Sequence, residues 1–413
     1  MTATAQDAYQ ERLNRILDAV ALKVPDRIPV LLINGFHAAK YGNINLKDAY
    51  HDPEKWYQAN KKMLLELQPD IYQDPWMINP AKAMEALDFK QIKWPGHGIP
   101  EDHSFQFVED EYMKPEEYDA LMDDPSDFAV RTYLPRICGA LEAFKTLPTL
   151  KAFLTGYPAI GVTAAYAQPE VVAAFESLAK AGREYLKYIE KKQEFYKEMA
   201  EFPVWGVVGV VVPFDLISDM LRGMRGSMLD MYRNPDKLLE AQEKLYPMVR
   251  ESAIVNAKIN NTPFVFMALH RGADGFMSIK QFEKFYWPYL KRLILDTIDA
   301  GLIPFVCFEG SYDERLEYLK ELPKGKIIAW LDSTDIFKAK KVIGDTHCIA
   351  GNLPVSLLQT GTPEKVKDYT KKLIDEVGRD GGYIMSTRGV LDEADPELVK
   401  VWVEFTKEYG VYK

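Results

Sequence analysis

The sequence predicts an α/β fold, a closed barrel of eight parallel strands with helices around it, and three observations support this prediction. The second half of the chain alternates short apolar runs with helical segments, which is the pattern of parallel β/α units. The 413 residues are 47% hydrophobic and 12% aromatic, which is enough for a large core. No linker or change in composition divides the chain, so we expect residues 1–413 to form a single barrel domain.

The first half of the chain contains fewer strands than the second. A helix is expected over 6–21, before Pro25, and a buried strand over 28–33. A helix over 53–67 leads to a short strand at 70–73. Residues 88–127 are rich in charge, proline and turn residues, and we interpret them as an elaboration on the barrel. Apolar residues at helical spacing predict a long amphipathic helix from Pro169 to about Ala200, packed on a large surface.

In the second half, strands are expected at 264–269, 303–307, 327–331, 348–350 and 382–385, and helices at 279–300, 312–322, 336–342 and 363–377. Active sites of parallel barrels lie at the C-terminal ends of the strands. The polar and aromatic residues expected at these ends are Asn34 to His37, Asp74, Tyr157, His270 to Asp274, Cys307 to Glu309, Asp332, Gly351 to Asn352 and Ser386 to Arg388.

The charge of the chain excludes some classes of partner. There are 61 acidic and 51 basic residues, a net charge of −10, and no long basic block, so neither nucleic acid nor an anionic membrane is an expected partner. Small molecules or proteins are the expected partners, and an oligomer is possible. Three widely spaced cysteines without a signal peptide indicate a reducing, cytoplasmic environment, and no apolar run reaches membrane-spanning length.

Cys307, Phe308 and Glu309 close one expected strand. Side chains two residues apart in a strand point the same way, so the thiol and the carboxylate would emerge together. This pair is typical of half a metal site or of an acid/base site; the alternative is a buried cysteine beside a glutamate that begins a loop. His270 also follows a strand, where it is either functional or a satisfied polar group.

Several phrases resemble the uroporphyrinogen decarboxylase superfamily, which also contains corrinoid-dependent methyltransferases. They are Asp26-Arg27-Ile28-Pro29-Val30, Lys93-Trp94-Pro95-Gly96, Leu221-Arg222-Gly223, Gly351-Asn352-Leu353-Pro354 and Gly361-Thr362-Pro363-Glu364. The last two together are the most specific. The resemblance implies a distorted (β/α)8 TIM barrel, in agreement with the alternation described above.

The residues after the first strand argue against a tetrapyrrole substrate. The decarboxylases carry arginines there to hold many carboxylates, whereas this chain has Leu31-Leu32-Ile33-Asn34-Gly35-Phe36-His37. Asp74 stands roughly at the place of the decarboxylase aspartate, but its neighbours Pro75, Trp76 and Met77 are apolar. These neighbours indicate a pocket for a compact aromatic or apolar substrate.

The methyltransferase branch of the family binds zinc through a His-x-Cys pair and a later cysteine. In this chain Cys307 and Glu309 occupy the positions of the pair, and Ser386-Thr387-Arg388 falls where the later cysteine would be. Zinc accepts thiolate, imidazole and carboxylate ligands, so Cys307, Glu309 and His270 form a hypothetical three-ligand zinc site.

The resemblance therefore implies the O-demethylase type of methyltransferase. Such an enzyme moves a methyl group from a methoxylated aromatic compound to the cobalamin of a separate corrinoid protein, and needs a Lewis acid or general acid at the ether oxygen. We expect Glu309, His270 and Asp74 to be catalytic. The residues expected to contact substrate are His37, Phe36, Trp76, Tyr157, Tyr166, Phe214, Asp274 and Phe308.

Three alternatives stay open at this point. One is a methylcobalamin:thiol methyltransferase of the coenzyme M type, which would need a complete zinc site. Another is a decarboxylase, and the third is a barrel that only docks a corrinoid protein. Asp335, before the helix at Ile336, is expected to be a helix cap, and Cys138 is expected to pack in the core.

Overall fold

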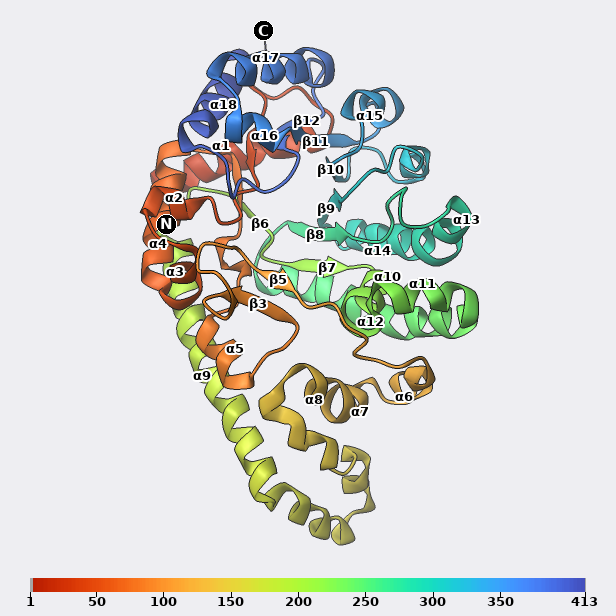
Figure 1. The fold of residues 1–413 in the computed structure, drawn as a ribbon. Helices are drawn as coiled ribbons and strands as arrows, with labels where there is room; N and C mark the ends of the chain where they lie inside the picture. Colours follow the sequence, from red (N-terminus) through yellow and green to blue (C-terminus); the bar gives the residue numbers. More distant parts are fainter. Residues whose placement is uncertain (1–2, 413) are drawn as a thin grey trace.

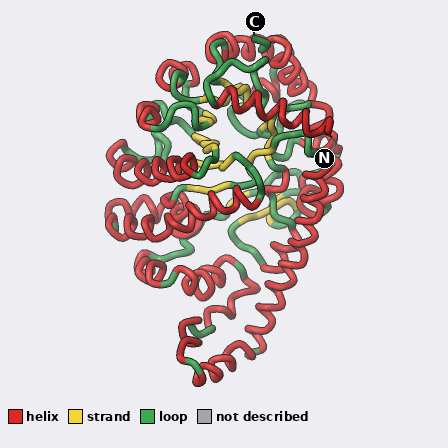
Figure 2. The backbone as a smooth tube through the Cα atoms, turned by 180° about the vertical axis from the view of Figure 1, so that it is seen from behind, coloured by secondary structure: helices red, strands yellow, loops and turns green. Residues whose placement is uncertain are grey.

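The computed structural model describes residues 3–412 and contains a ring of parallel strands at its centre (Figure 2). Hydrogen bonds join the strands into sheets ordered β1-β2-β6 and β12-β11-β10-β9-β8-β7, and a parallel bridge between Val30 and Met385 joins β1 to β12. The bounds are β1 Leu31–Leu32, β2 Ile71–Gln73, β6 Val204–Trp205, β7 Gly209–Val211, β8 Phe264–Leu269, β9 Ile303–Phe308, β10 Ile328–Leu331, β11 Cys348–Leu353 and β12 Tyr383–Thr387. The predicted barrel is confirmed.

We call each of the strand positions around the barrel a stave. The third stave consists of two short strands, β6 and β7. β6 pairs with β2 through Gln73 and Trp205, and β7 pairs with β8 through Gly209 and Phe266. Between them Gly206 has a φ of +83°, a backbone conformation that side chains with a Cβ rarely adopt. With β6 and β7 counted as one, eight staves surround the interior of the described chain. The sequence reasoning missed this stave because the apolar run is interrupted by the bend.

Helices cover the outside of the barrel (Figure 1). The main ones are α1 Ala3–Val20, α4 Pro53–Leu67, α10 Pro213–Leu216, α11 Gly223–Arg233, α12 Pro235–Ile259, α14 Trp287–Asp299, α15 Ile336–Ile343, α17 Pro363–Leu373 and α18 Pro396–Tyr409. Shorter helices are α2 Ala38–Gly42, α3 Leu46–His51, α5 Ala81–Leu87, α6 Tyr118–Asp123, α7 Pro125–Phe128, α8 Leu134–Ile137, α13 Ile279–Gln281 and α16 Val355–Thr360. Most predicted elements are present, but the helix expected at 312–322 is only a 3₁₀ turn over Leu316–Glu321.

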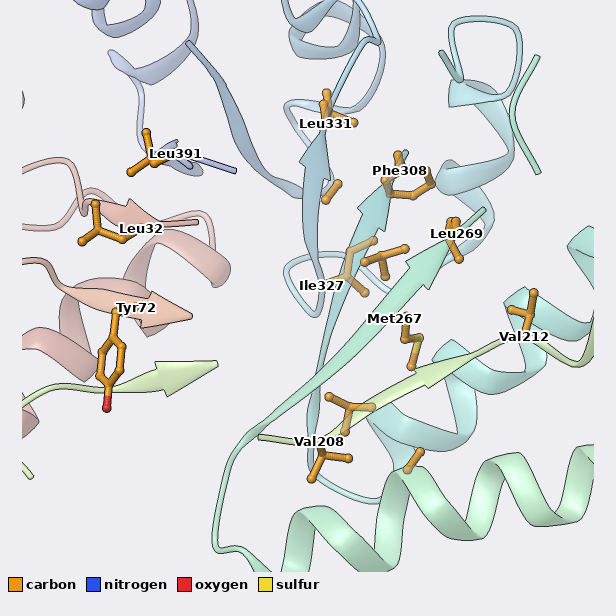
Figure 3. Packing of buried hydrophobic residues seen from close by; sticks show 14 of the residues in the cluster. Leu32, Tyr72, Val208, Val212, Met267, Leu269, Phe308, Ile327, Leu331 and Leu391 are labelled. Atoms are coloured by element: carbon orange, nitrogen blue, oxygen red, sulfur yellow. The ribbon is translucent and has the colours of Figure 1, made fainter. Parts of the chain in front are cut away.

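Side chains of the strands alternate between the barrel interior and the helix layer. Figure 3 shows the outward set, including Met267, Leu269, Phe308 and Leu331, packed in the cluster between strands and helices. The inward set forms a second buried cluster that contains Phe305, Cys307, Trp330, Cys348 and Ile384. Cys138 is buried in a third cluster, and the Asp335 side chain caps α15, so both minor predictions are confirmed.

An insertion between β2 and β6 supplies most of the remaining chain. Residues 88–127 carry a small sheet made of β3 Ile92–Pro95, β4 Gly98–Ile99 and β5 Gln106–Phe107, which agrees with the predicted elaboration. The long helix α9 Pro169–Glu198 confirms the predicted amphipathic helix. Its first half extends away from the barrel together with 3₁₀ helices over 139–167, and we call residues 139–186 the arm (Figure 1).

The expectation that Tyr157 lies at a strand end is wrong. Tyr157 begins a 3₁₀ helix in the arm and is 87% exposed, and Tyr166 packs on Phe153 and Phe175 of the arm. The Gly156-Tyr157-Pro158 turn therefore belongs to the insertion and not to a barrel loop. Within residues 3–412, no helix is long and apolar enough to cross a membrane.

Candidate active site

The interior of the barrel is filled by aromatic rings below the strand ends. Trp205 lies 5.0 Å from Phe266 and 4.8 Å from Phe305 between ring centroids, and Trp330 lies 6.2 Å from Phe305. Both indoles are fixed by their N–H groups, because Trp205 donates to the Leu32 carbonyl and Trp330 to the Thr387 carbonyl. We call these four residues the aromatic floor. These rings fill the barrel interior directly below the strand ends.

Polar residues occupy one level above this floor on neighbouring staves. Ala268 pairs with Cys307, and Cys307 with Trp330, so the residues two positions later, His270, Glu309 and Asp332, come at one height. The Gly310 N–H donates to Asp332 Oδ2 at 3.0 Å, which ties two of these strand ends together. On β11 and β12 the same level is reached by Asn352 and Ser386, which pair in register.

A fully buried carboxylate fixes the end of β8. Asp215, on α10, accepts hydrogen bonds from the backbone N–H groups of His270 and Arg271 at 3.0 Å and from the Tyr286 hydroxyl at 2.6 Å. Burial, reinforced by the negative charge of Asp219, raises the pKa of Asp215 to about 7. Asp215 therefore fixes the backbone of His270 and Arg271 at the end of β8.

His270 carries a proton at neutral pH because of its second acidic neighbour. Its Nδ1 lies 2.5 Å from Asp219 Oδ2, and Arg271 holds the same carboxylate at 3.2 Å. Burial by itself lowers the pKa of His270, but the hydrogen bond and charge of Asp219 outweigh burial and raise this pKa to about 9. The imidazolium is therefore held in one orientation, with Nε2 directed away from Asp219.

The other ring nitrogen of His270 faces Glu309. Nε2 lies 3.8 Å from Glu309 Oε1, and the glutamate side chain is 49% exposed at the open mouth. Partial burial, together with the charge of Asp332, raises the pKa of Glu309, while His270 opposes this shift. The structure thus brings together His270 and Glu309, both expected from the sequence. The arrangement can donate a proton from Nε2 and take one up from solvent.

The residues near Cys307 do not fit a zinc site. The Cys307 side chain is fully buried in the apolar interior, its Sγ is 3.9 Å from Glu309 Oε1, and burial raises the thiol pKa well above its usual value. Across residues 3–412, no three His, Cys, Asp or Glu side chains are grouped so that they could hold a metal ion. Cys307, Glu309 and His270 therefore do not form a zinc site in this structure.

Two of the predicted carboxylates are bound to cations of the protein. Asp74 is buried, accepts a hydrogen bond from the Trp76 N–H through its side chain, and pairs with Lys192 of α9 at 2.8 Å. Asp274 pairs with the buried Arg315 and accepts from the Ser311 hydroxyl at 2.8 Å. Both carboxylates link insertion or loop segments to the barrel, which is the role that these contacts support.

The predicted aromatic wall residues lie in the core between strands and helices. Phe36 packs on Tyr50 and Trp56, and Trp76 packs on Tyr188. Phe214 and Phe308 are buried in the outer cluster, in which Figure 3 labels Phe308, so neither side chain lies in the barrel interior.

His37 is also buried, and burial lowers its pKa to about 4, so its ring is neutral. Among the predicted histidines, His270 is thus the one that carries a proton at neutral pH.

The two carboxylates that hydrogen-bond to His270 were not predicted from the sequence. Neither Asp215 nor Asp219 was among the residues expected in the site. The available signal was the spacing of four residues between Asp215 and Asp219 in Pro213-Phe214-Asp215-Leu216-Ile217-Ser218-Asp219, which places both on one side of a helical turn. The turn follows the stave that the sequence did not reveal.

This chain is similar in sequence to curated uroporphyrinogen decarboxylases. It is 26% identical over 189 residues to the uroporphyrinogen decarboxylase of Chlorobium phaeobacteroides, covering 41% of this chain and 53% of that protein. It is 29% identical over 185 residues to that of Chlorobaculum tepidum, covering 43% of this chain and 51% of that protein. The matches thus span about half the length of these curated relatives.

Among solved structures, a methyltransferase from Methanosarcina mazei has a similar fold. Its TM-score is 0.61 at 14% identity, with 96% of this chain and 98% of that chain covered. The family model described as uroporphyrinogen decarboxylase (URO-D) matches residues 158–409, which include all staves from β6 to β12. This chain therefore belongs to the uroporphyrinogen decarboxylase family.

Proposed function

We propose that this protein is a methyltransferase that moves a methyl group from a methoxylated aromatic compound to the corrinoid of a separate protein. The observation that carries the proposal is the protonated His270, oriented by Asp219 above an aromatic floor. Cleavage of a phenyl methyl ether needs an apolar surface for the ring and an acid for the leaving oxygen. The strand ends carry the acid, His270, and the aromatic floor lies in the interior below it.

The chemistry of the leaving group suits His270. As the methyl–oxygen bond breaks, the oxygen retains the bonding electrons and takes the proton of His270 Nε2, so that a phenol leaves. A phenol has a pKa of about 10, slightly above the pKa of about 9 of His270, so this proton transfer is favourable. Glu309 then lies close enough to pass a proton from solvent back to the ring. The partner's corrinoid, when docked, supplies the nucleophilic cobalt that accepts the methyl group.

The alternatives receive less support from the mouth. A uroporphyrinogen carries many carboxylates, and the acidic side chains Asp219, Glu309 and Asp332 around His270 would repel several of them. A thiol methyltransferase needs a zinc-bound thiolate, and the surroundings of Cys307 do not fit one. A methoxylated aromatic compound meets neither obstacle.

The test is anaerobic turnover with a reduced corrinoid protein and a panel of methoxybenzenes, with the phenol product measured by chromatography. His270→Gln should reduce the rate about 100-fold or more, because it removes the acid. The matched control His103→Gln, in an exposed loop, should keep the wild-type rate. If the wild-type protein releases no phenol from any ether while the corrinoid partner is active, the proposal is wrong.

A further inference from the structure

Among the arginines of the described residues, Arg388 is the one that is partly buried and has no carboxylate partner. Eleven of the fifteen arginines lie within 4.0 Å of an acidic side chain, as the ion pairs of Arg15, Arg222 and Arg315 illustrate. Arg183, Arg225 and Arg233 have no such pair but are exposed. Arg388 is partly buried, and within residues 3–412 its Nε has no hydrogen-bond partner although it is shielded from solvent.

Ser386 is a second unsatisfied group on the same strand. Its side chain is fully buried, and its Oγ has no partner among the described residues. Ile384 lies in the interior cluster, so Ser386 and Arg388, two and four residues later, follow the inward-facing side of β12. A buried hydroxyl and a buried guanidinium N–H without partners are costly, and a bound anion would satisfy both.

The position of these groups in the barrel is opposite His270. β12 is the eighth stave and β8 the fourth, so four staves separate them in either direction around the ring. The aromatic floor, contributed by staves three to six, lies in the barrel interior below these strand ends. The mouth is therefore acidic and proton-donating on one wall and cationic on the other.

We propose that the substrate is a methoxylated aromatic carboxylate, with its carboxylate held by Arg388 and Ser386 and its ether oxygen at His270. This inference rests on the proposed function and adds the anionic group of the substrate. A guanidinium binds a carboxylate in a planar, two-point geometry that fixes the ring orientation. A polycarboxylate would not fit in the same way, because the acidic opposite wall would repel its other carboxylates.

Calorimetric titration of the whole protein with para-methoxybenzoate and its neutral isostere para-methoxybenzamide tests this inference without a corrinoid partner. Wild-type protein should bind the benzoate about tenfold or more tightly than the amide, as expected for a charge-assisted contact. Arg388→Met should abolish this preference, and Arg388→Lys should retain part of it. Arg183→Met removes the same charge from the arm and should leave the preference unchanged.

Equal binding of the two ligands by wild type, or an unchanged preference in Arg388→Met, would overturn the inference. If Arg388→Met does not fold, Ser386→Ala replaces it as the test of the anion contact. This variant should weaken benzoate binding several-fold and leave amide binding nearly constant. A benzoate preference without methyl transfer to an active corrinoid partner counts against the proposed function alone. Turnover of neutral ethers without any benzoate preference counts against this inference alone.

Discussion

Replacing Asp219 with asparagine isolates the electrostatic support of the His270 proton. The asparagine oxygen can still accept the hydrogen bond from Nδ1, but the negative charge is gone. The ordinary histidine pKa of 6.5 is raised to about 9 in this site, which corresponds to about 3 kcal/mol in favour of the protonated ring. The His270 side chain is 31% exposed, so solvent screening reduces this contribution to about 2 kcal/mol.

The direct assay is the titration of the His270 ring by NMR, with the resonance assigned by its loss in His270→Gln. Wild type should titrate near pH 9, and Asp219→Asn at least about one pH unit lower, because burial then opposes the proton with less compensation. In the methyl-transfer assay the activity should be lost as pH rises through the same midpoint. A wild-type midpoint at or below 6.5, or one unchanged by Asp219→Asn, would refute the reasoning.

The same shift predicts how stability depends on pH. Because folding raises the pKa of His270, its contribution to stability is complete below about pH 6.5 and is lost as pH rises through about 9. Urea unfolding of wild type and His270→Gln at pH 6 and pH 9.5 should show the stability difference shrinking by about 2 kcal/mol at the higher pH. A difference that grows with pH would contradict the assigned direction of the shift.

Three further predictions concern the support of the barrel. Asp70→Asn should lower the free energy of unfolding by about 3–5 kcal/mol in urea, because the buried carboxylate binds Arg15 at 2.6 Å, Arg27 at 2.7 Å and the Val30 N–H at 2.8 Å. Lys192→Met should cost about 3 kcal/mol by leaving the buried Asp74 uncompensated, and adding Asp74→Asn should recover most of that loss. Trp330→Phe should reduce the fluorescence quenching caused by a bound methoxyarene, because it removes one of two floor indoles.

Each of these has a control on the same molecule. Asp375→Asn breaks surface pairs with Lys371 and Arg379 and should cost at most about 1 kcal/mol, so an equal loss for Asp70→Asn would contradict the buried network. Trp287→Phe changes an indole in the helix layer and should leave quenching intact. If the Asp74→Asn substitution alone destroyed turnover without a loss of stability, Asp74 would be catalytic and not structural.

The sequence predicted those strands and helices that can be recognised from the residues of a single segment. The runs at 264–269 and 303–308 are buried on both faces and bounded by turns, so their apolar content identifies them as strands. β6 is two residues long, and the stave made of β6 and β7 is bent at Gly206, so neither length nor alternation could reveal this stave. Its existence depends on pairing with β2 and β8, which are distant in sequence.

Only those site residues whose direction follows from the alternation of side chains along a strand could be predicted. His270 and Glu309 follow long strands, and their common direction could be inferred from the sequence. Asp219 acts through a contact between α10–α11 residues and β8, 51 positions away along the chain. Arg388 is informative because it has no acidic partner among residues 3–412, and no sequence pattern reports such an absence.

The insertion after β2 has a consequence for how the barrel closes during folding. Gln73 and Trp205 pair directly although about 130 residues separate them, so one barrel seam must wait for a long chain to return. Loop-closure entropy grows only as the logarithm of length, and an insertion of this size costs roughly 1 kcal/mol more than an ordinary β/α connection. The barrel can therefore carry the arm at little thermodynamic expense, while the β2–β6 seam should be among the last to form.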